Sequence, residues 1–376
     1  MIRFLFRSPL LRILLFLLLG FTSATDATPR KDYWLFQEYL AQNPNQIALS
    51  KQFQNQVQQP SAALKFRQQK PVRIVVIYPG NQVSDYWRRS LDVLEKRLRE
   101  LQINFELTPF FSRPSLQADL QEVQFRKALK MAPDYLVVTL DSNRHRRMIE
   151  RALAKGATKL IVQNMTTPIK AWSTNPPLLY VGFDHHQGTA LLSDAIFARH
   201  NPDRTDFSVL FREQGYVSDA RGKGFINHLN AKNSPPLSQF YTHSDRKSAR
   251  IAALDALDRN PEVDFFYACS TDVAFGALDA LREKGRLQNV KVNGWGGGGA
   301  ELASIRAGEM DLTVMRINDD NGIAMAEAIK NDLEGVPVPQ VFSGRFVIVT
   351  QDTPALKLDE LRRQAFQYSG VGEEAQ

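Results

Sequence analysis

Residues 72–87 read VRIVVIYPGNQVSDYW, and this stretch defines the first structural unit of the chain. Its first seven residues are mostly β-branched, which is typical of a strand that is buried on both faces of a parallel sheet. Pro79 and Gly80 end this strand, and Ser84 is placed to cap the helix that follows. That helix has apolar residues at spacings of four and three, and a second strand follows at 102–108. The stretch therefore predicts a βαβ unit.

Strand and helix patterns continue to alternate along the rest of the chain. The predicted strands are 72–78, 102–108, 135–140, 159–163, 178–183, 207–211, 237–242, 263–268, 290–294 and 312–316. Strands that alternate with helices form parallel sheets. Ten strands are more than one sheet usually holds, and the pattern of residues 72–178 recurs in 179–294. We therefore expect an α/β protein of two similar lobes, each with a parallel sheet flanked by helices.

The N-terminus has the pattern of a secretory signal peptide. Arginines precede an apolar run, and small residues at 22–24 follow it. An uncleaved anchor is the alternative, but the run is shorter than a spanning helix and Arg12 interrupts it. We expect residues 1–24 to be removed by cleavage after Ala24, which places the mature protein in an exported compartment.

Residues 25–69 have a composition unlike the rest of the chain. Tyr33, Trp34 and Phe36 belong to a segment that can form an amphipathic helix, whereas residues 52–69 are polar and rich in glutamine. We interpret this region as an N-terminal extension packed on the first lobe, followed by a poorly structured linker.

Charge and cysteine content limit the possible functions. The 376 residues carry a formal net charge of +7, and 43% of them are apolar. A small positive excess is usual for a solvated surface, and no basic block indicates nucleic-acid binding. Cys269 is the single cysteine, so no internal disulfide is possible, and its apolar neighbours predict a buried core position.

Polar and aromatic residues follow the carboxyl ends of several predicted strands, where open α/β sheets bind their ligands. They are Gln82, Ser84, Trp87, Asn164, Arg221, Thr271, Asp272, Trp295 and Arg316. Each one alone has an ordinary explanation, such as a helix cap for Thr271. Together, their amides, hydroxyls and rings suit a small polyhydroxylated ligand. Two arginines against the single carboxylate of Asp272 favour an anionic ligand.

Other motifs do not indicate a catalytic or metal site. The four glycines 296–299 lack the lysine and the serine or threonine of a phosphate-binding loop, so we interpret them as a flexible segment that crosses between lobes. His145, His185 and His186 have no partners at metal-ligand spacing and are expected at the surface. We expect a binding protein without enzymatic activity or a resident cofactor.

Six motifs resemble one family of exported receptors. They are 78–87 (YPGNQVSDYW), 166–168 (TTP), 180–184 (YVGFD), 267–274 (YACSTDVA), 293–298 (NGWGGG) and 314–320 (VMRINDD). These motifs resemble the LuxP family, the periplasmic autoinducer-2 receptors of quorum sensing. The resemblance extends from the Tyr33-Trp34 region to about Tyr368, which is essentially the whole mature chain.

The resemblance implies a type I periplasmic binding-protein fold, with ligand held between two lobes joined by three crossing segments. It implies a first lobe of residues 70–181 with 296–334, a second lobe of 182–295 with 335–368, and a tail of 369–376. The ligand of the family is a furanosyl borate diester, so boron is expected only as part of the ligand.

The resemblance also implies a role for each candidate residue. Arg221 and Arg316 face the borate, and Asp272 accepts a hydrogen bond from a ring hydroxyl. The two tryptophans form walls, and the remaining residues bind hydroxyl or borate oxygens: Gln82, Ser84, Asn164 and Thr271. Family members signal through a LuxQ-type membrane sensor histidine kinase. Two alternatives stay open, a periplasmic ribose-like sugar-binding protein that feeds an ABC transporter and an exported α/β enzyme.

Overall fold

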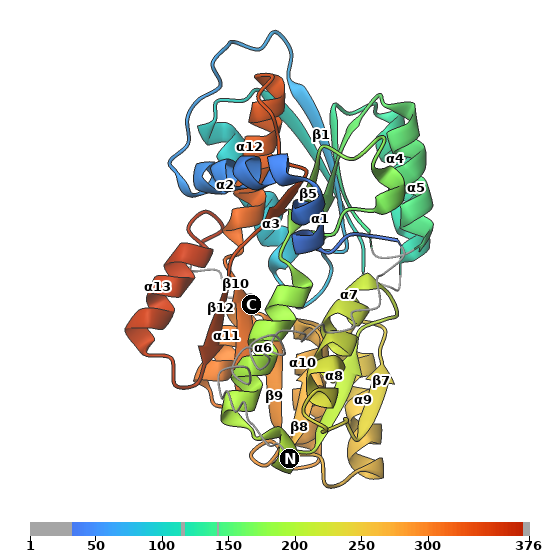
Figure 1. Ribbon diagram of the computed structural model, residues 1–376, viewed down its shortest axis with the longest axis vertical. Coiled ribbons are helices and arrows are strands. Elements are labelled where there is room, and N and C mark those ends of the chain that lie inside the picture. The colour runs from blue at the N-terminus through green and yellow to red at the C-terminus, as the bar shows by residue number, and fades with distance from the viewer. Residues whose placement is uncertain (1–31, 114–116, 141–142, 371–376) are drawn as a thin grey trace, which may run out of the picture. The chain divides into compact units, whose positions relative to one another are not determined.

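Two six-stranded sheets organise the part of the chain that the computed structural model describes, residues 32–113, 117–140 and 143–370 (Figure 1). The first sheet has the order β11-β5-β4-β3-β1-β2, and all of its strands are parallel. Its strands are β1 (Val72–Tyr78), β2 (Phe105–Phe111), β3 (Tyr135–Thr139), β4 (Lys159–Gln163), β5 (Leu179–Gly182) and β11 (Val341–Ser343). We call this sheet and its helices the first lobe.

The second sheet has the order β12-β10-β9-β8-β6-β7 and forms the second lobe with its helices. Only the edge strand β12 is antiparallel to its neighbour, β10. The strands are β6 (Phe207–Phe211), β7 (Ser238–Tyr241), β8 (Phe265–Ala268), β9 (Lys291–Gly296), β10 (Leu312–Arg316) and β12 (Phe346–Thr350). The expected α/β fold with two lobes is confirmed.

Helices connect the strands and cover both faces of each sheet. The α-helices are α1 (Phe36–Gln42), α2 (Pro44–Gln58), α3 (Tyr86–Glu100), α4 (Ala118–Lys130), α5 (Asn143–Lys155), α6 (His185–Arg199), α7 (Tyr216–Ser218), α8 (Gly224–Asn230), α9 (Arg246–Arg259), α10 (Thr271–Glu283), α11 (Gly299–Arg306), α12 (Asp319–Leu333) and α13 (Ala355–Ala365). Short turns complete the set: η2 (Lys170–Trp172), η3 (Pro202–Arg204) and the π-helical turn η4 (Asp219–Lys223). No helix within the described ranges has the length and apolar character needed to cross a membrane.

Strand β1 explains why the first sheet lies in the core. Ile74 and Val76 pack into one buried cluster, and Val75 and Ile77 pack into another. Neighbouring side chains of a strand point to opposite faces, so both faces of the sheet are covered. Each fully buried side chain of this size contributes about 1.5–3 kcal/mol. The apolar run of residues 72–78 is thus explained by the burial of both faces of this strand.

Three segments connect the lobes, and they follow β5, β10 and β11. Backbone hydrogen bonds join them to one another: Gly344 N donates to Gly182 O at 2.8 Å, and Ile317 N donates to Arg345 O at 2.9 Å. An ion pair between Arg345 and Asp320, with 2.9 Å between Nη2 and Oδ1, ties the second and third segments. The crossings therefore form one connected hinge.

The expected lobe boundaries differ from the structure near the C-terminus. Range 296–334 was assigned to the first lobe, yet β10 within it pairs with β9 and β12 of the second sheet. Range 335–368 was assigned to the second lobe, yet β11 within it pairs with β5 of the first. The chain still crosses three times, but the second and third crossings follow β10 and β11. The sequence did not indicate these positions, because strand pairing between distant segments leaves no periodic signal.

The N-terminal extension packs on the first lobe, but its linker is shorter than expected. Helix α2 continues to Gln58, so the first part of the glutamine-rich stretch is helical. Phe53 and Val57, four residues apart, are buried against the lobe, while the Gln56 amide donates to Glu327 at 2.7 Å. Only one narrow stripe of this helix is apolar. The many polar residues around it made the segment look like a linker in the sequence.

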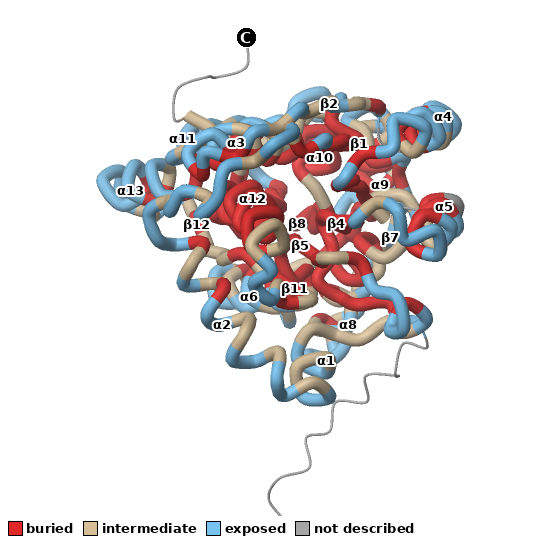
Figure 2. The backbone as a smooth tube through the Cα atoms, turned by 90° about the horizontal axis from the view of Figure 1, so that it is seen from above, coloured by how far each residue is buried: buried red, intermediate tan, exposed pale blue. Residues whose placement is uncertain are grey.

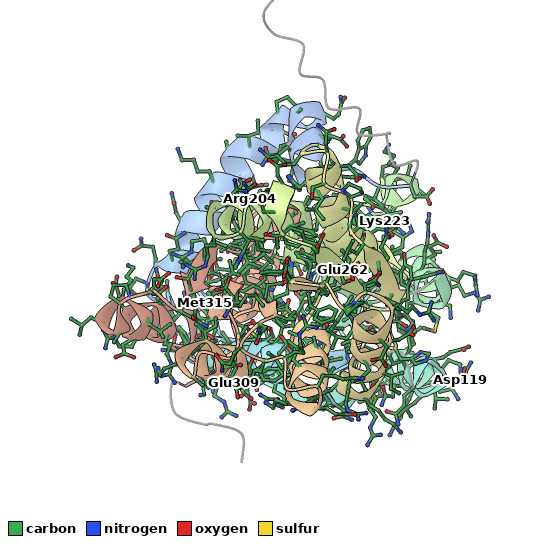
Figure 3. All side chains as sticks on the ribbon, turned by 90° about the horizontal axis from the view of Figure 1, so that it is seen from below. Asp119, Arg204, Lys223, Glu262, Glu309 and Met315 are labelled. Carbon is green, nitrogen blue, oxygen red and sulfur yellow. The ribbon has the colours of Figure 1, made fainter. Side chains whose placement is uncertain are left out.

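Helix α12 is enclosed along nearly its whole length, as Figure 2 shows by its red colour. It packs against α3 and α2 of the first lobe. Many charged side chains lie on the outside of the molecule (Figure 3), where partly exposed pairs such as Arg282 with Glu309, 2.7 Å apart, offset one another.

Candidate functional site

All nine candidate residues line one cavity at the carboxyl ends of the strands. The cavity is lined by Gln82, Ser84, Tyr86, Trp87, Asn164, Arg212, Arg221, Ser270, Thr271, Asp272, Trp295 and Arg316. The first lobe contributes the β1–α3 connection and the residue after β4, and the second contributes residues that follow or end β6, β8, β9 and β10. Tyr86, Arg212 and Ser270 belong to the cavity and were not among the candidates.

Arg221 lies in the π-helical turn η4, between α7 and α8. Such turns interrupt the regular hydrogen-bond ladder of a helix and occur frequently at functional sites. The residue is 4% exposed; its Nη1 donates to Cys269 O at 2.8 Å, and its Nη2 lies 3.3 Å from His185 Nδ1. Its Cζ lies 3.5 Å from the centre of the Trp295 ring. Arg221 is thus held by a carbonyl, an imidazole and an indole, all of them neutral. Cys269 is buried, as predicted.

Arg316 ends β10 and is 6% exposed. Its Cζ lies 4.1 Å from the centre of the Tyr86 ring and 5.8 Å from that of Phe183. A β-carbon at Gly296 would come within 2.4 Å of Arg316 Nη2, so the guanidinium occupies space that only glycine leaves free. Aromatic faces attract the cation without neutralising it.

The cavity has a surplus of positive charge. Burial, together with the charges of Arg316 and Arg212, lowers the pKa of Arg221 well below its ordinary value. Burial also lowers the pKa of Arg316, although Tyr86, Glu301 and Asp85 partly oppose this. Because arginine keeps its proton in proteins, two buried cations that share a cavity with one carboxylate, that of Asp272, are unfavourable until an anion joins them.

Several buried polar atoms of the lining have no hydrogen-bond partner among the described residues. They are Asn164 Oδ1, Arg221 Nε, Ser270 Oγ, Trp295 Nε1 and Arg316 Nε. Buried polar groups are nearly always paired in folded proteins, so unpaired ones need an explanation. One acceptor, one hydroxyl, one indole N–H and two charged donors around the same cavity are a set that a hydroxylated anion can satisfy.

Asp272 holds the two lobes together in this structure. Its Oδ1 accepts from Val83 N at 2.9 Å, and its Oδ2 accepts from Ser84 N at 3.3 Å. Burial raises the pKa of the Asp272 carboxyl, and these two bonds oppose that rise. The residue thus joins the second lobe to the β1–α3 connection, a contact that sequence reasoning did not foresee.

The two helix caps expected near the cavity are wrong. Asp85, not Ser84, is the N-cap residue of α3, and Ser270, not Thr271, is the N-cap residue of α10. Neither N-cap side chain accepts a hydrogen bond from a backbone N–H of its helix, although Asp85 pairs with the Arg89 side chain of α3. The Ser84 and Thr271 side chains therefore line the cavity without a capping role.

The four-glycine segment is a packed loop, which corrects its interpretation as a flexible crossing. Gly297 has φ +67°, and a β-carbon there would lie 2.5 Å from Met315 Cα. The buried Glu301 carboxylate accepts from Trp295 N at 3.0 Å and from Gly297 N at 2.8 Å. The loop stays within the second lobe and fixes the backbone of Trp295.

His185 and Tyr86 are buried residues of the site that the candidate list lacks. His185 was expected at the surface but is fully buried, and its ring packs edge-on against Trp295. The Tyr86 hydroxyl accepts from Asn321 Nδ2 at 2.7 Å and from Gln163 Nε2 at 3.2 Å. Both residues begin a helix that follows a strand, so the strand-end rule could have found them.

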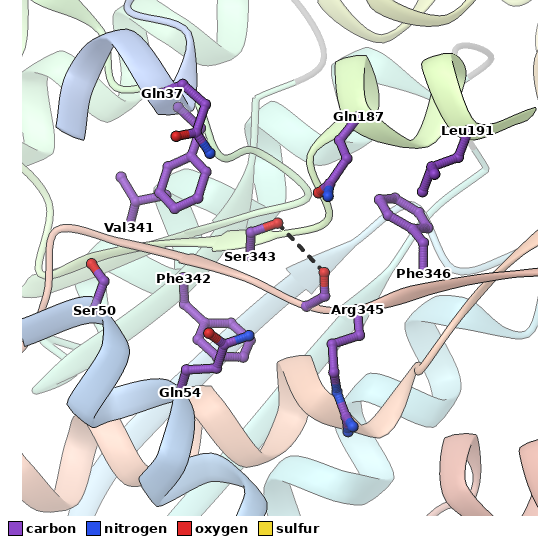
Figure 4. A pocket seen from close by; sticks show the side chains of 12 residues that line it. Gln37, Ser50, Gln54, Gln187, Leu191, Val341, Phe342, Ser343, Arg345 and Phe346 are labelled. Atoms are coloured by element: carbon purple, nitrogen blue, oxygen red, sulfur yellow. Dashed lines mark hydrogen bonds between the residues drawn. The ribbon is translucent and has the colours of Figure 1, made fainter. Parts of the chain in front are cut away.

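The cavity between the lobes is small, about 30 Å³, which is room for about two water molecules. A sugar-sized ligand needs more space, so binding requires the lobes to separate and close again around it. A larger hollow of about 340 Å³ lies at the third crossing segment, between Gln37 and Gln54 of the N-terminal helices and Gln187 of α6 (Figure 4). None of the nine candidate residues lines it, so it is separate from the predicted site. No metal-ligand cluster occurs among the residues described.

Comparison with known proteins identifies relatives of the fold. A family model described as periplasmic binding protein domain matches residues 74–337. A carbohydrate transporter solute-binding protein from Agrobacterium radiobacter, in complex with D-arabinose, superposes with a TM-score of 0.66 and 18% identity, over 78% of this chain and 99% of that one. A periplasmic ribose ABC transporter protein from Conexibacter woesei superposes with a TM-score of 0.66 and 18% identity, over 82% of this chain and 98% of that one. The glucose-galactose binding protein GanP from Geobacillus stearothermophilus superposes with a TM-score of 0.67 and 18% identity, over 76% of this chain and 100% of that one.

Proposed function

This chain belongs to the periplasmic binding protein family, and we propose that it is a receptor for autoinducer-2 in its furanosyl borate diester form. Members of the family bind substrates without converting them, so the protein is a binding protein and not an enzyme. The proposal concerns which ligand it binds and what it signals to.

The surplus charge of the cavity is the observation that supports an anionic ligand. Arg221 and Arg316 are buried, line the same space and are held by neutral groups. The carboxylate of Asp272 already accepts two backbone hydrogen bonds. A neutral sugar would leave both guanidinium charges unbalanced in a buried site. A negatively charged tetrahedral borate on a hydroxylated ring offers charge-assisted hydrogen bonds to both.

Ligand binding would change the balance between separated and closed lobes. The lining comes from both lobes, so a ligand that contacts both binds the closed arrangement better and shifts the population toward it. The nine candidate residues keep the roles that the resemblance implies, with one addition. Asp272 also joins the lobes through Val83 N and Ser84 N, so its role extends to closure.

The proposed setting is the periplasm, with a membrane sensor kinase as partner. The predicted signal peptide, residues 1–24, lies outside the described residues and stays a prediction. The LuxQ-type kinase follows from the motif resemblance alone. Binding of the purified periplasmic part of such a kinase, measured with and without ligand, tests this part of the proposal separately.

A second candidate is a binding protein for a neutral ribose-like sugar that delivers it to an ABC transporter. The structural relatives named above favour it, since their names describe sugar-binding and transport proteins. The aromatic side chains of Trp87 and Trp295 suit a sugar ring as well as a furanosyl borate. The two candidates differ in the charge of the ligand.

The identity of a ligand released from the purified protein tests the proposal. We expect mass spectrometry of the released material to give the autoinducer-2 skeleton, and boron NMR of the loaded protein to give a tetrahedral borate signal. Release of an unborated pentose or hexose would contradict the proposal and support the second candidate.

A further inference from the structure

We infer that His185 is a positioning residue that aims the Arg221 guanidinium at the cavity while leaving its charge available to the ligand. The inference deepens the proposed function and rests on it. His185 does not line the cavity itself, so it acts through Arg221 and through Asn164.

The hydrogen bonds of His185 fit one neutral form of the imidazole. Its Nε2 lies 3.3 Å from the carbonyl oxygen of Asn164, which can only accept. Its Nδ1 lies 3.3 Å from Nη2 of Arg221, which can only donate. The proton is therefore on Nε2, and Nδ1 uses its lone pair to hold the arginine.

The surroundings of His185 keep it neutral. The ring is fully buried, and burial together with the charges of Arg221, Arg316 and His186 lowers its pKa well below the ordinary value. The bond to Asn164 opposes this shift to a lesser extent. A neutral acceptor orients a guanidinium as a carboxylate would, but it leaves the positive charge without a counter-ion.

His185 also joins the two lobes at the site. Asn164 belongs to the first lobe, whereas His185 and Arg221 belong to the second. Asn164 has φ +65°, a left-handed conformation that is uncommon for residues other than glycine. The His185 ring lies edge-on to Trp295 with ring centres 5.5 Å apart. One fixed ring thus links the Asn164 backbone, the guanidinium and the indole.

Three substitutions separate these roles. His185→Leu removes both hydrogen bonds, His185→Asn keeps an acceptor at the position of Nδ1, and His185→Asp keeps that acceptor but adds a negative charge. The measured quantity is the ratio of dissociation constants for autoinducer-2 without and with borate. A charged hydrogen bond is worth about 1.5–3 kcal/mol, or roughly tenfold or more in affinity. We expect His185→Leu and His185→Asp to reduce the ratio about tenfold, and His185→Asn to recover most of it.

Two results keep failure of the inference distinct from failure of the proposed function. If the wild-type protein shows no preference for the borated form, the proposed function fails. Nitrogen NMR of the ring then still decides the inference, because a neutral Nε2-protonated His185 from pH 5 to 8 supports it and a titrating ring contradicts it. If the wild type prefers the borated form but His185→Leu and His185→Asp, folded by circular dichroism, keep the wild-type ratio, the inference is overturned and the function stands.

Discussion

Arg221 and Arg316 depend for their proposed role on the neutral groups around them. A surface arginine pairs with a carboxylate or with water, whereas these two contact a carbonyl, an imidazole and aromatic rings. In the sequence, each arginine taken alone has an ordinary explanation. Burial with unpaired Nε atoms is what makes the pair an anion site.

Replacing Arg316 by glutamine should weaken binding of the borated ligand at least tenfold, since it removes a charged hydrogen bond worth about 1.5–3 kcal/mol. Calorimetry measures the change. Arg250→Gln is the matched control, because Arg250 lies on α9 in a surface pair with Glu283. Equal affinities for the two variants would contradict the role of Arg316.

The candidate residues could be predicted because motifs place them at strand ends, and all nine line one cavity. His185 and Tyr86 were missed for a different reason. Their roles depend on hydrogen bonds to Arg221, Asn164 and Asn321, partners that are distant in the chain. Their position at the start of a helix after a strand could have made them candidates, but neither residue type nor spacing shows these hydrogen bonds.

The loop after β9 requires glycine because of its backbone conformation and its close packing. Gly297→Ala should destabilise the protein by about 1–3 kcal/mol from its positive φ alone, and by more because the new β-carbon meets Met315 Cα. Gly308→Ala is the control, since Gly308 has φ +76° with nothing within 4 Å. Urea unfolding compares the two, and equal losses would show that the loop is not closely packed.

Helix α12 should give the protein a pH-dependent stability through Asp319. Its carboxylate accepts from Tyr368 N at 2.6 Å and from Ser369 Oγ at 2.7 Å, and burial raises its pKa to about 6. The unfolded chain has a pKa of about 3.9, so the folded state binds more protons between these values. This contribution to stability is complete below about pH 4 and is lost as pH rises through 6, by roughly 3 kcal/mol in total.

Unfolding free energies at pH 4 and pH 7 test this. The unfolding free energy should fall less between pH 4 and pH 7 in Asp319→Asn than in the wild type, by roughly 3 kcal/mol, because asparagine does not ionise. Asp359→Asn, at an exposed position of α13, serves as control and should behave as wild type. An Asp319→Asn protein with the pH profile of the wild type would sink the assignment.

Elements with strong local patterns could be predicted, and elements defined by distant partners could not. All ten predicted strands exist, although β2 is shifted toward Phe111. Strand β11 has three residues, too few to show a period, and β12 lies outside the strand–helix alternation that revealed the others. The pairing of β10 with β9 and β12 likewise leaves no pattern in the local sequence, which is why the predicted lobe boundaries differ from the structure.

Two carboxylates join the lobes of the whole molecule in this structure. Asp272 of the second lobe accepts from Val83 N, and Asp85 of the first lobe accepts from Gly299 N at 3.2 Å. Each contact forms only when the lobes are together. They therefore add to the energy difference between separated and closed arrangements that a ligand shifts.

Removing the second contact should open the ligand-free protein. Asp85→Ala is expected to raise the radius of gyration measured by X-ray scattering without ligand. It should also weaken binding severalfold, because the ligand must then supply the closure energy that Asp85 contributed. Saturating ligand should restore the wild-type radius. Identical scattering of variant and wild type without ligand would show that Asp85 does not hold the lobes.

The charge of the ligand is the central claim, and calorimetry of wild-type protein with autoinducer-2 in borate-free and borate-containing buffer tests it most directly. With two buried guanidinium groups facing the ligand, borate should tighten binding at least tenfold, and ribose should bind much more weakly than the borated form. Equal affinity with and without borate, or ribose binding as tightly as the borated ligand, would contradict the account.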